Sequence, residues 1–351
     1  MTKYIIVGQG LAGTLLAYQM HQNKIPFKII ADPTQKSASE IAAGLINPLV
    51  FKRLTKSWMV DSLFPKMYET YSEMEELLSI KFIEQKQMIK PLAEQDIPMW
   101  EKRIDQGKMN HYIDRIDKDL KLEGFKAIEH YGALMQTGSC NLSLLIRAMR
   151  TFFKQHSYLI EDHLKIDDVT FTDRYVQWKD LSAEKIIFCR GYQDAKNALF
   201  PADSFYLTKG ELIEIEAKSL CEDYILNKNL FVLPTGNHHF KVGATYQWDT
   251  IDEDTSEEGK SELLTKLDKL IDTDYTILNH WAGVRPTVKD RRPILGIHPQ
   301  NDRLAIFNGL GTKGVMLAPY FSEQMLELLE NPEAEVDEEV KLERFSRSSS
   351  K

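Results

Sequence analysis

Residues 4–20 read YIIVGQGLAGTLLAYQM, and this stretch decides the fold of the N-terminal part of the chain. The apolar run at 4–7 predicts a short strand, and the glycines after it predict a tight turn. Apolar side chains then recur at helical spacing up to Met20, and a second apolar run, FKII at 27–30, leads to Asp32. The pattern predicts a β-α-β unit with parallel strands and a right-handed crossover.

The three glycines of this turn, Gly8, Gly10 and Gly13, have the spacing of a dinucleotide-binding loop. Gly8 permits the turn, Gly10 lets a pyrophosphate approach the backbone, and Gly13 lets the helix pack closely on the strand. The helix start directs N–H groups and a positive dipole at the phosphates. Asp32 is placed to accept hydrogen bonds from ribose hydroxyls, which disfavours NADP. The alternative is that these glycines form a turn without binding a ligand. The glycine pattern also does not distinguish FAD from NAD.

The composition is that of a folded protein of about two domains. The chain has 351 residues, of which 43% are hydrophobic and 27% charged. Its formal charge of −8 disfavours a nucleic-acid partner. Cys140, Cys189 and Cys221 form no C-x-x-C pair, so we expect reduced thiols in the cytoplasm. We expect no secretory signal and no membrane span, because glycines and polar residues interrupt the apolar stretches.

Further elements follow from the spacing of apolar residues. Residues 57–79 and 141–153 have helical periodicity, and the apolar strand at 185–188 precedes Gly191. Several strand-like runs between 204 and 248 predict a mostly antiparallel sheet.

Other segments are less regular. Residues 81–132 show no clear pattern, the acidic stretch 252–258 is interpreted as a solvated turn that enters a helix, and we expect a frayed end at 346–351. His238 and His239 are interpreted as part of a hairpin turn, because no further ligand cluster accompanies them. No metal site is predicted.

Five blocks of the sequence resemble, in the same order, successive blocks of the FAD-dependent D-amino-acid oxidase and glycine oxidase (DAO) family. They are SASEIAAGLINP (37–48), LTKGELIEI (207–215), LFVLPTGNHHFKVGATY (230–246), WAGVRPTVKDRRPILG (281–296) and NGLGTKGVMLAP (308–319). The resemblance implies an α/β and α+β protein with a glutathione-reductase-type fold, in which a Rossmann-like FAD-binding domain is interleaved with a substrate domain built on a mostly antiparallel sheet. The expected FAD-binding domain comprises residues 1–80, 133–200 and 282–345, and the expected substrate domain comprises residues 81–132 and 201–281.

The resemblance also assigns the residues around the cofactor, which we expect to be non-covalent FAD because Pro286-Thr287-Val288 follows Arg285 where sarcosine oxidases attach flavin to a cysteine. The glycine loop and Asp32 hold the AMP half and the pyrophosphate. The glycine-rich start of the last helix, with Lys313 nearby, stabilises the charge of the reduced ring. The remaining expected FAD contacts are Ala42, Ala43, Gly44, Gly191, Gly309, Gly311, Thr312, Gly314 and Val315.

Several residues are candidates for contacts with the substrate or with oxygen. Arg285 matches the arginine that pairs with the substrate carboxylate, and the alternative is an interdomain salt bridge. Phe231 replaces a tyrosine that contacts the carboxylate in relatives that oxidise glycine, so glycine is a doubtful substrate. Lys241 matches the lysine that helps reduced flavin react with oxygen in sarcosine oxidases, or it is an outward-facing strand lysine. Tyr246, Trp248 and Trp281 are candidate pocket or core aromatics.

The resemblance therefore implies an FAD-dependent oxidation of the C–N bond of a small amine or amino acid. Hydride passes to flavin N5, water hydrolyses the imine, and O2 or another acceptor reoxidises the flavin. A second interpretation follows from GATYQW (243–248) and GVRPTVKDRRPILG (283–296), which are also similar to the FAD domain of the bifunctional tRNA wobble-uridine modifying enzyme. A third is a flavin-binding or electron-transfer protein without turnover of its own. The substrate and the oligomeric state stay open.

Overall fold

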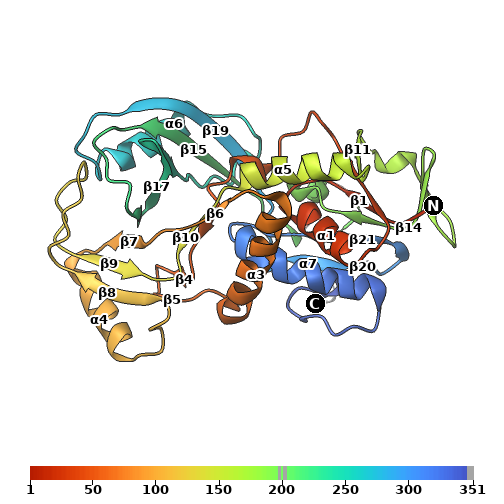
Figure 1. Ribbon diagram of the computed structural model, residues 1–351, viewed down its shortest axis with the longest axis horizontal. Coiled ribbons are helices and arrows are strands. Elements are labelled where there is room, and N and C mark those ends of the chain that lie inside the picture. Colours follow the sequence, from red (N-terminus) through yellow and green to blue (C-terminus); the bar gives the residue numbers. More distant parts are fainter. Residues whose placement is uncertain (197–198, 201–203, 346–351) are drawn as a thin grey trace.

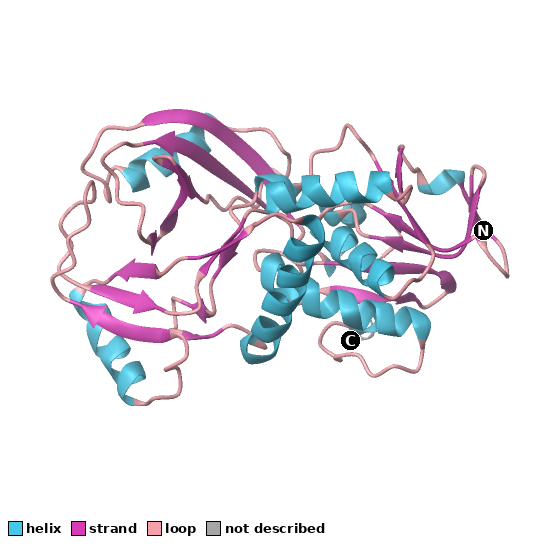
Figure 2. Ribbon diagram, in the orientation of Figure 1, coloured by secondary structure: helices cyan, strands magenta, loops and turns pink. Residues whose placement is uncertain are grey.

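The computed structural model describes residues 1–196, 199–200 and 204–345 of the chain. Its strands form two large sheets that lie at opposite ends of the long axis of the molecule, with helices gathered around the first sheet (Figures 1 and 2). The tail expected at 346–351 lies outside the described residues.

The first sheet is mainly parallel. Across it the strands are β11 (Leu159–Glu161), β2 (Phe27–Ala31), β1 (Thr2–Val7), β14 (Leu181–Phe188), β21 (Asn301–Asn308) and β20 (Ile294–His298). Only β20 is antiparallel in this series, and the hairpin of β12 (Val169–Phe171) and β13 (Val176–Trp178) adds two antiparallel strands beside β14. The predicted β-α-β unit is confirmed, since α1 (Leu11–Gln22) joins the parallel strands β1 and β2.

The continuous apolar run of β1 exists because this sheet is buried on both faces. Tyr4 and Ile6 pack into one core, whereas Ile5 and Val7 pack into another. The first core also receives side chains from five helices: α1, α3 (Val60–Leu78), α4 (Ile97–Asp105), α5 (Leu142–Gln155) and α7 (Gly314–Glu330). The helices predicted at 57–79 and 141–153 are thus confirmed.

The second sheet is mostly antiparallel, as predicted. Its strands in order are β19 (Thr276–Arg285), β15 (Thr208–Glu216), β18 (His239–Gly243), β17 (Leu230–Gly236), β16 (Ile225–Lys228), β7 (Met88–Pro91), β9 (Tyr131–Leu134) and β8 (Ile113–Asp117). Only β16 and β7 pair in parallel. The helix expected after the acidic stretch is α6 (Glu257–Leu267), which packs against this sheet. The hairpin expected at His238 is confirmed, since that residue lies in the turn between β17 and β18 with a φ of +61°.

The segment 81–132 supplies β7, β8 and the start of β9 to the second sheet, although its sequence shows no pattern. The strands there are short, and charged residues interrupt them. β9 ends at Leu134 and β19 ends at Arg285, so both strands continue past the boundaries expected at 132 and 281. The division into two domains itself stays a prediction.

Smaller elements complete the described chain. They are α2 (Ala38–Ile41), β3 (Leu45–Ile46), β4 (Leu49–Val50), β5 (Thr55–Lys56), β6 (Ile83–Gln85), η1 (Glu94–Asp96), α4 (Ile97–Asp105), β10 (Gly138–Cys140), η2 (Ile166–Asp168), η3 (Gly191–Lys196) and η5 (Leu342–Arg344). In this part of the chain no helix is long and apolar enough to cross a membrane, and no group of three or more His, Cys, Asp or Glu side chains could hold a metal. A cytoplasmic location stays a prediction.

The helix α7 accommodates Pro319 inside its second turn. Proline has no N–H, so the carbonyl of Val315, one turn earlier, loses its helical partner. The hydroxyl of Tyr71 in α3 donates to this carbonyl at 2.9 Å. A tertiary contact therefore supplies the hydrogen bond that the local sequence removes.

Candidate active site

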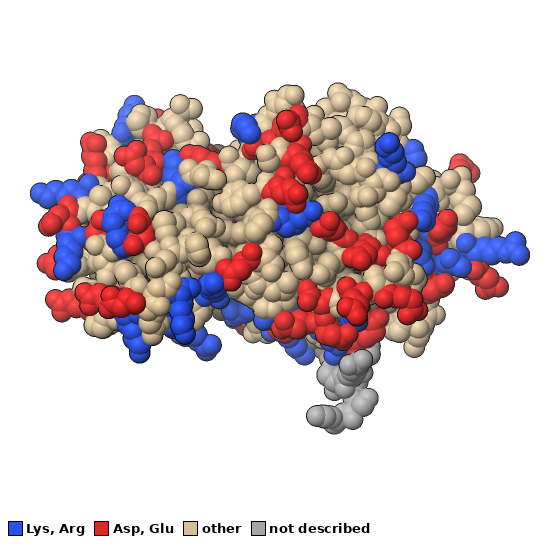
Figure 3. Space-filling view, turned by 60° about the horizontal axis from the view of Figure 1, so that its bottom comes forward, with Lys and Arg blue, Asp and Glu red and all other residues tan. Residues whose placement is uncertain are grey.

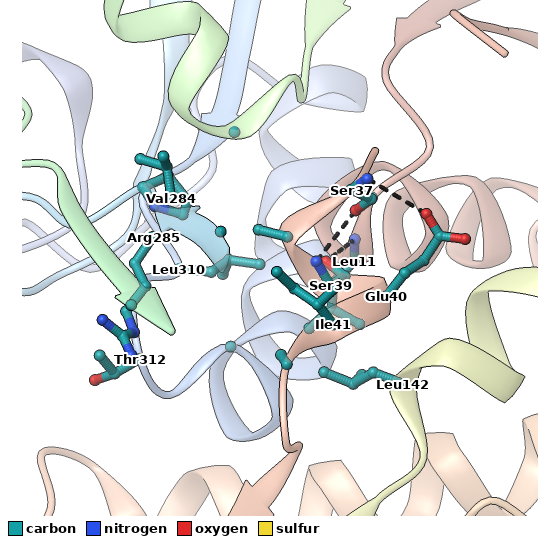
Figure 4. Close-up of a pocket in the computed structure, with 18 of the residues that line it drawn as sticks. Leu11, Ser37, Ser39, Glu40, Ile41, Leu142, Val284, Arg285, Leu310 and Thr312 are labelled. Carbon is teal, nitrogen blue, oxygen red and sulfur yellow. Dashed lines mark hydrogen bonds between the residues drawn. The ribbon is translucent and has the colours of Figure 1, made fainter. Parts of the chain in front are cut away.

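A cavity of about 490 Å³ lies where the carboxyl ends of the parallel strands meet the second sheet (Figure 4). Ligands of open α/β sheets usually bind at this edge. The cavity brings together most of the residues that we expected to contact cofactor or substrate: Gly8, Gly10, Asp32, Ala42, Ala43, Gly44, Gly191, Arg285, Gly311, Thr312, Gly314 and Val315. Gly13, Gly309, Lys241 and Lys313 are not among its lining residues.

One end of the cavity lies at the start of α1. The φ of Gly8 is +103°, a conformation that favours glycine, and its N–H donates to the carbonyl of Ile30 at 2.9 Å. The N–H of Leu11 donates to Ser39 Oγ at 3.1 Å (Figure 4). The following N–H groups of this first turn have no carbonyl before them in the helix, so they are available to an anion. Gly13 lies behind the loop, where a side-chain carbon would overlap the carbonyl of Gly8.

Asp32 lies at the same end, at the carboxyl terminus of β2. One carboxylate oxygen accepts from the hydroxyl and the N–H of Thr34, at 2.6 and 2.8 Å. The other lies 2.8 Å from Nδ1 of His163. These partners, Thr34 first, lower the pKa of Asp32 to about 2. The group is therefore a carboxylate at neutral pH and can accept further hydrogen bonds.

The start of α7 forms another wall of the cavity. Gly311, Thr312, Gly314 and Val315 line it, and the φ of Gly311 is +54°. Two helix N-termini thus point at one cavity, and both favour negative charge on a ligand.

Lys313, which caps this helix, turns away from the cavity. Its ammonium group donates to the carbonyl of Asn47 at 3.2 Å and to the hydroxyl of Ser57. Burial lowers its pKa to about 8. The side chain of Lys313 is therefore engaged outside the cavity, and stabilisation of a reduced ring by the start of α7 stays a prediction.

Two other expected contacts serve packing. A side-chain carbon on Gly44 would overlap the carbonyl of Cys140, and one on Gly309 would approach Val288 Cγ2 to 2.6 Å. Both glycines also have a positive φ, of +70° and +76°. Gly44 lines the cavity as well, whereas Gly309 lies behind it.

Arg285, at the end of β19, is the charged group at the end of the cavity that faces the second sheet. Its guanidinium donates to the carbonyls of Lys209 and Thr245, with every donor–acceptor distance at 3.3 Å, and lies 4.4 Å from the ring centre of Tyr246. Among the described residues no carboxylate pairs with it. Burial lowers the pKa of this guanidinium, because the cavity wall solvates its charge less well than water does. The interdomain salt bridge, our alternative for Arg285, is therefore not formed with any described residue.

Gly210, which our sequence analysis did not single out, makes this arrangement possible. It lies on β15 opposite Gly283, and a side-chain carbon there would overlap the guanidinium of Arg285. The LTKGELIEI block contains this glycine, but only the strand pairing reveals what its missing side chain leaves room for.

Lys241 does not face open solvent. It is half-buried on β18, with its ammonium 5.8 Å from the ring centre of Trp281. Burial lowers its pKa. The nearby charge of Glu214 raises the pKa in part, and the charge of Arg147 lowers it. Lys241 lies on the same face of the strand as Gly243, because side chains two residues apart point the same way. Gly243 lines the cavity, whereas Lys241 does not. Its role toward oxygen stays a prediction.

A buried ion pair supports the cavity edge between β14 and β21. Arg190 Nε donates to Asp194 Oδ1 at 2.8 Å, and Asn308 Nδ2 donates to Asp194 Oδ2 at 2.8 Å. Asp194 is completely buried, whereas Arg190, Gly191 and Asn308 line the cavity. Arg190 and Asp194 are only four residues apart, but they match no motif, and Asn308 joins them from a distant part of the chain, so the sequence did not reveal this cluster.

These features fit a dinucleotide that carries a flavin. The glycine loop and the start of α1 suit a pyrophosphate, Asp32 suits a ribose, and the small residues Ala42 and Ala43 leave room along the wall that leads toward α7. The fold and the site define a nucleotide-binding protein whose second sheet presents a buried cation to the far end of the same cavity.

The chain belongs to the DAO family of FAD dependent oxidoreductases, whose family model matches residues 3–328. The cofactor of this family is FAD.

Known relatives agree with this placement. The chain is 32% identical over 129 residues to a glycine oxidase of Bacillus licheniformis, and the match covers 36% of this chain and 35% of that protein. The match thus spans about a third of each chain. Among solved structures, a glycine oxidase of Bacillus cereus ATCC 14579 has a TM-score of 0.77 at 17% identity, covering 95% of this chain and 96% of that one. The iminodiacetate oxidase of Chelativorans sp. BNC1 has a TM-score of 0.79 at 19% identity, with 97% and 98% covered. At these identities the likeness concerns the fold.

Proposed function

We propose that this protein oxidises the C–N bond of a small amine or amino acid that carries a carboxylate, with non-covalently bound FAD as the oxidant. The observation that carries the proposal is the guanidinium of Arg285 in the wall of the cavity, which contacts backbone carbonyls and pairs with no carboxylate of the described residues. A buried cation without a counter-ion costs stability, so its presence at the cavity is best explained by an anionic ligand. A guanidinium binds both oxygens of a carboxylate and stays charged when desolvated.

When bound, FAD supplies the chemistry by accepting the hydride that the substrate α-carbon loses as the amine becomes an imine, which water hydrolyses. The residues of the chain orient the reactants. Arg285 holds the carboxylate, while Gly210, Gly243 and Gly283 present no side chains to the space in front of it. The backbone N–H groups at the start of α7 favour negative charge that collects on the side of the ring they face.

No protein base is needed at the substrate end. Its lining residues include Leu212, Leu230, Phe231 and Tyr246, and none of the described ones there carries a carboxylate or an imidazole. We therefore propose that the amine reacts in its neutral form, with the lone pair of its nitrogen as the internal electron donor. Phe231 contributes no hydroxyl to a carboxylate, so we expect glycine to be a poor substrate.

An anaerobic bleaching screen tests the proposal. The yellow protein is mixed with D-amino acids, glycine, N-methyl amino acids and polyamines, and loss of the flavin absorbance marks a substrate. We expect carboxylate substrates to bleach it and Arg285→Ala to slow these selectively. If Arg285→Ala weakened carboxylates no more than neutral amines, the assigned recognition would be wrong. Peroxide formed under air would identify O2 as the acceptor, and flavin released by acid precipitation would confirm non-covalent binding.

The alternative of a tRNA substrate finds no support beside the cavity. The segment after Trp248 carries Asp249, Asp252, Glu253 and Asp254, which would repel phosphates. Acidic side chains also gather around the C-terminal end of the described chain (Figure 3). A flavin-binding protein without turnover is the remaining alternative, and it would never be bleached by any amine.

A further inference from the structure

The substrate end of the cavity opens beside two aromatic rings that are half exposed to solvent. Tyr246 lines the cavity with 51% of its surface exposed. Trp248 lies beside it, outside the cavity lining, with 50% of its surface exposed. Their ring centres are 6.3 Å apart with an angle of 27° between the planes, so the rings are stacked. Since Tyr246 also lies against the guanidinium of Arg285, a row of three planar groups leads from the anion-binding site to the surface.

Exposed aromatic surface of this kind is uncommon in the described chain. Most of its aromatic side chains are buried, and the other exposed ones are Tyr175 and Tyr206. Water solvates apolar ring surface poorly, so exposed rings at the mouth of a binding cavity indicate a surface that a ligand covers.

The charges at this end limit what the ligand can carry. Arg285 is the only cation among the described lining residues near the rings, whereas Lys36, Arg150 and Arg190 line the cavity on the side of the first sheet. A second carboxylate would therefore have no partner here, and the acidic segment after Trp248 would repel it.

We propose that Tyr246 and Trp248 form a subsite for a planar aromatic or heteroaromatic arm of the substrate, whose single carboxylate is held by Arg285. This inference rests on the proposed function and specifies its substrate class as monocarboxylic amines with an aromatic substituent. Such a ring stacks on the row that begins at the guanidinium. Small amino acids leave the subsite empty and bind through the carboxylate alone.

Two redox-inert carboxylates test the subsite without turnover. Methoxyacetate and phenoxyacetate share the carboxylate and differ in the ring, and each is titrated against the flavin-loaded protein while the flavin absorbance is followed. We expect phenoxyacetate to bind at least about tenfold more tightly. Stacking on one ring contributes roughly two- to tenfold in affinity. Trp248→Ala, which removes a ring that does not contact Arg285, should weaken phenoxyacetate by about this factor and leave methoxyacetate unchanged.

The controls separate this inference from the proposed function. Trp248→Phe should restore phenoxyacetate binding, and Tyr175→Ala, which removes an exposed ring outside the cavity, should change neither ligand. Equal binding of the two carboxylates by the wild type, or an unchanged phenoxyacetate affinity in Trp248→Ala, would overturn the subsite. Methoxyacetate affinity that is insensitive to Arg285→Ala would instead overturn the proposed carboxylate site.

Discussion

The replacement of Arg285 by methionine separates binding from stability. The guanidinium is surrounded by two carbonyl groups and a tyrosine ring, with no described carboxylate in contact. Methionine keeps much of the volume and removes the charge. A hydrogen bond to a charged group contributes about 1.5–3 kcal/mol, so loss of the pair that a carboxylate makes should cost at least about 3 kcal/mol of binding free energy. That corresponds to an affinity about 150-fold lower.

The same substitution should leave the ligand-free protein at least as stable. Burial lowers the pKa of Arg285, which means that the folded state disfavours its charge. The hydrogen bonds to the carbonyls of Lys209 and Thr245 are long, at 3.3 Å, so they contribute little to the stability of the fold. We expect the unfolding free energy to change by less than about 1 kcal/mol.

Arg190 provides the matched control, because it also lines the cavity but is paired with a buried carboxylate. Arg190→Met would leave Asp194 without its counter-ion and should destabilise the fold by about 3–5 kcal/mol. Carboxylate titrations followed by flavin absorbance, and urea unfolding of both variants, give the comparison. Our reasoning fails if Arg285→Met destabilises the protein as much as Arg190→Met does and still binds carboxylates normally.

Three further outcomes are expected. Burial lowers the pKa of Lys313 to about 8, so the unfolded chain binds this proton more tightly, and the stability of the wild type relative to Lys313→Met should rise by roughly 2 kcal/mol between pH 8 and 9.5 in urea unfolding. Asp32→Asn should weaken FAD binding about tenfold in a fluorescence titration, and it should remove a loss of stability that the wild type shows as the pH falls from about 4 towards the lowered pKa of about 2. Tyr71→Phe leaves the carbonyl of Val315 unpaired and should lower the free energy of unfolding by about 1–3 kcal/mol. This loss should be smaller in a Pro319→Ala background, because the new N–H of residue 319 can reach that carbonyl. Equal losses in both backgrounds would contradict this account.

The local sequence was sufficient to predict elements whose conformation depends mainly on neighbouring residues. The run YIIVGQGLAG contains both the strand and the turn, and the positive φ of Gly8 and the close approach at Gly13 need only neighbouring residues. The helix at 314–330 and the alternating strands between 208 and 243 follow from periodicity in the same way. The segment 81–132 carries no such signal, because its short strands are stabilised by partners elsewhere in the second sheet.

Charge compensation could not be predicted in this way, since it depends on which groups surround a side chain once it is buried, even where the partners, as with Arg190 and Asp194, are only four residues apart. Arg190 and Arg285 look alike as sequence, yet the fold pairs the first with Asp194 and surrounds the second with backbone carbonyls. Lys313 stands beside the glycines of the cavity wall, but its ammonium group reaches Ser57 instead. The sequence alone thus specified the nucleotide-binding loop, because turn and helix geometry are local. Only the tertiary structure decided that no described carboxylate pairs with Arg285, because burial and pairing depend on how the chain folds around each side chain.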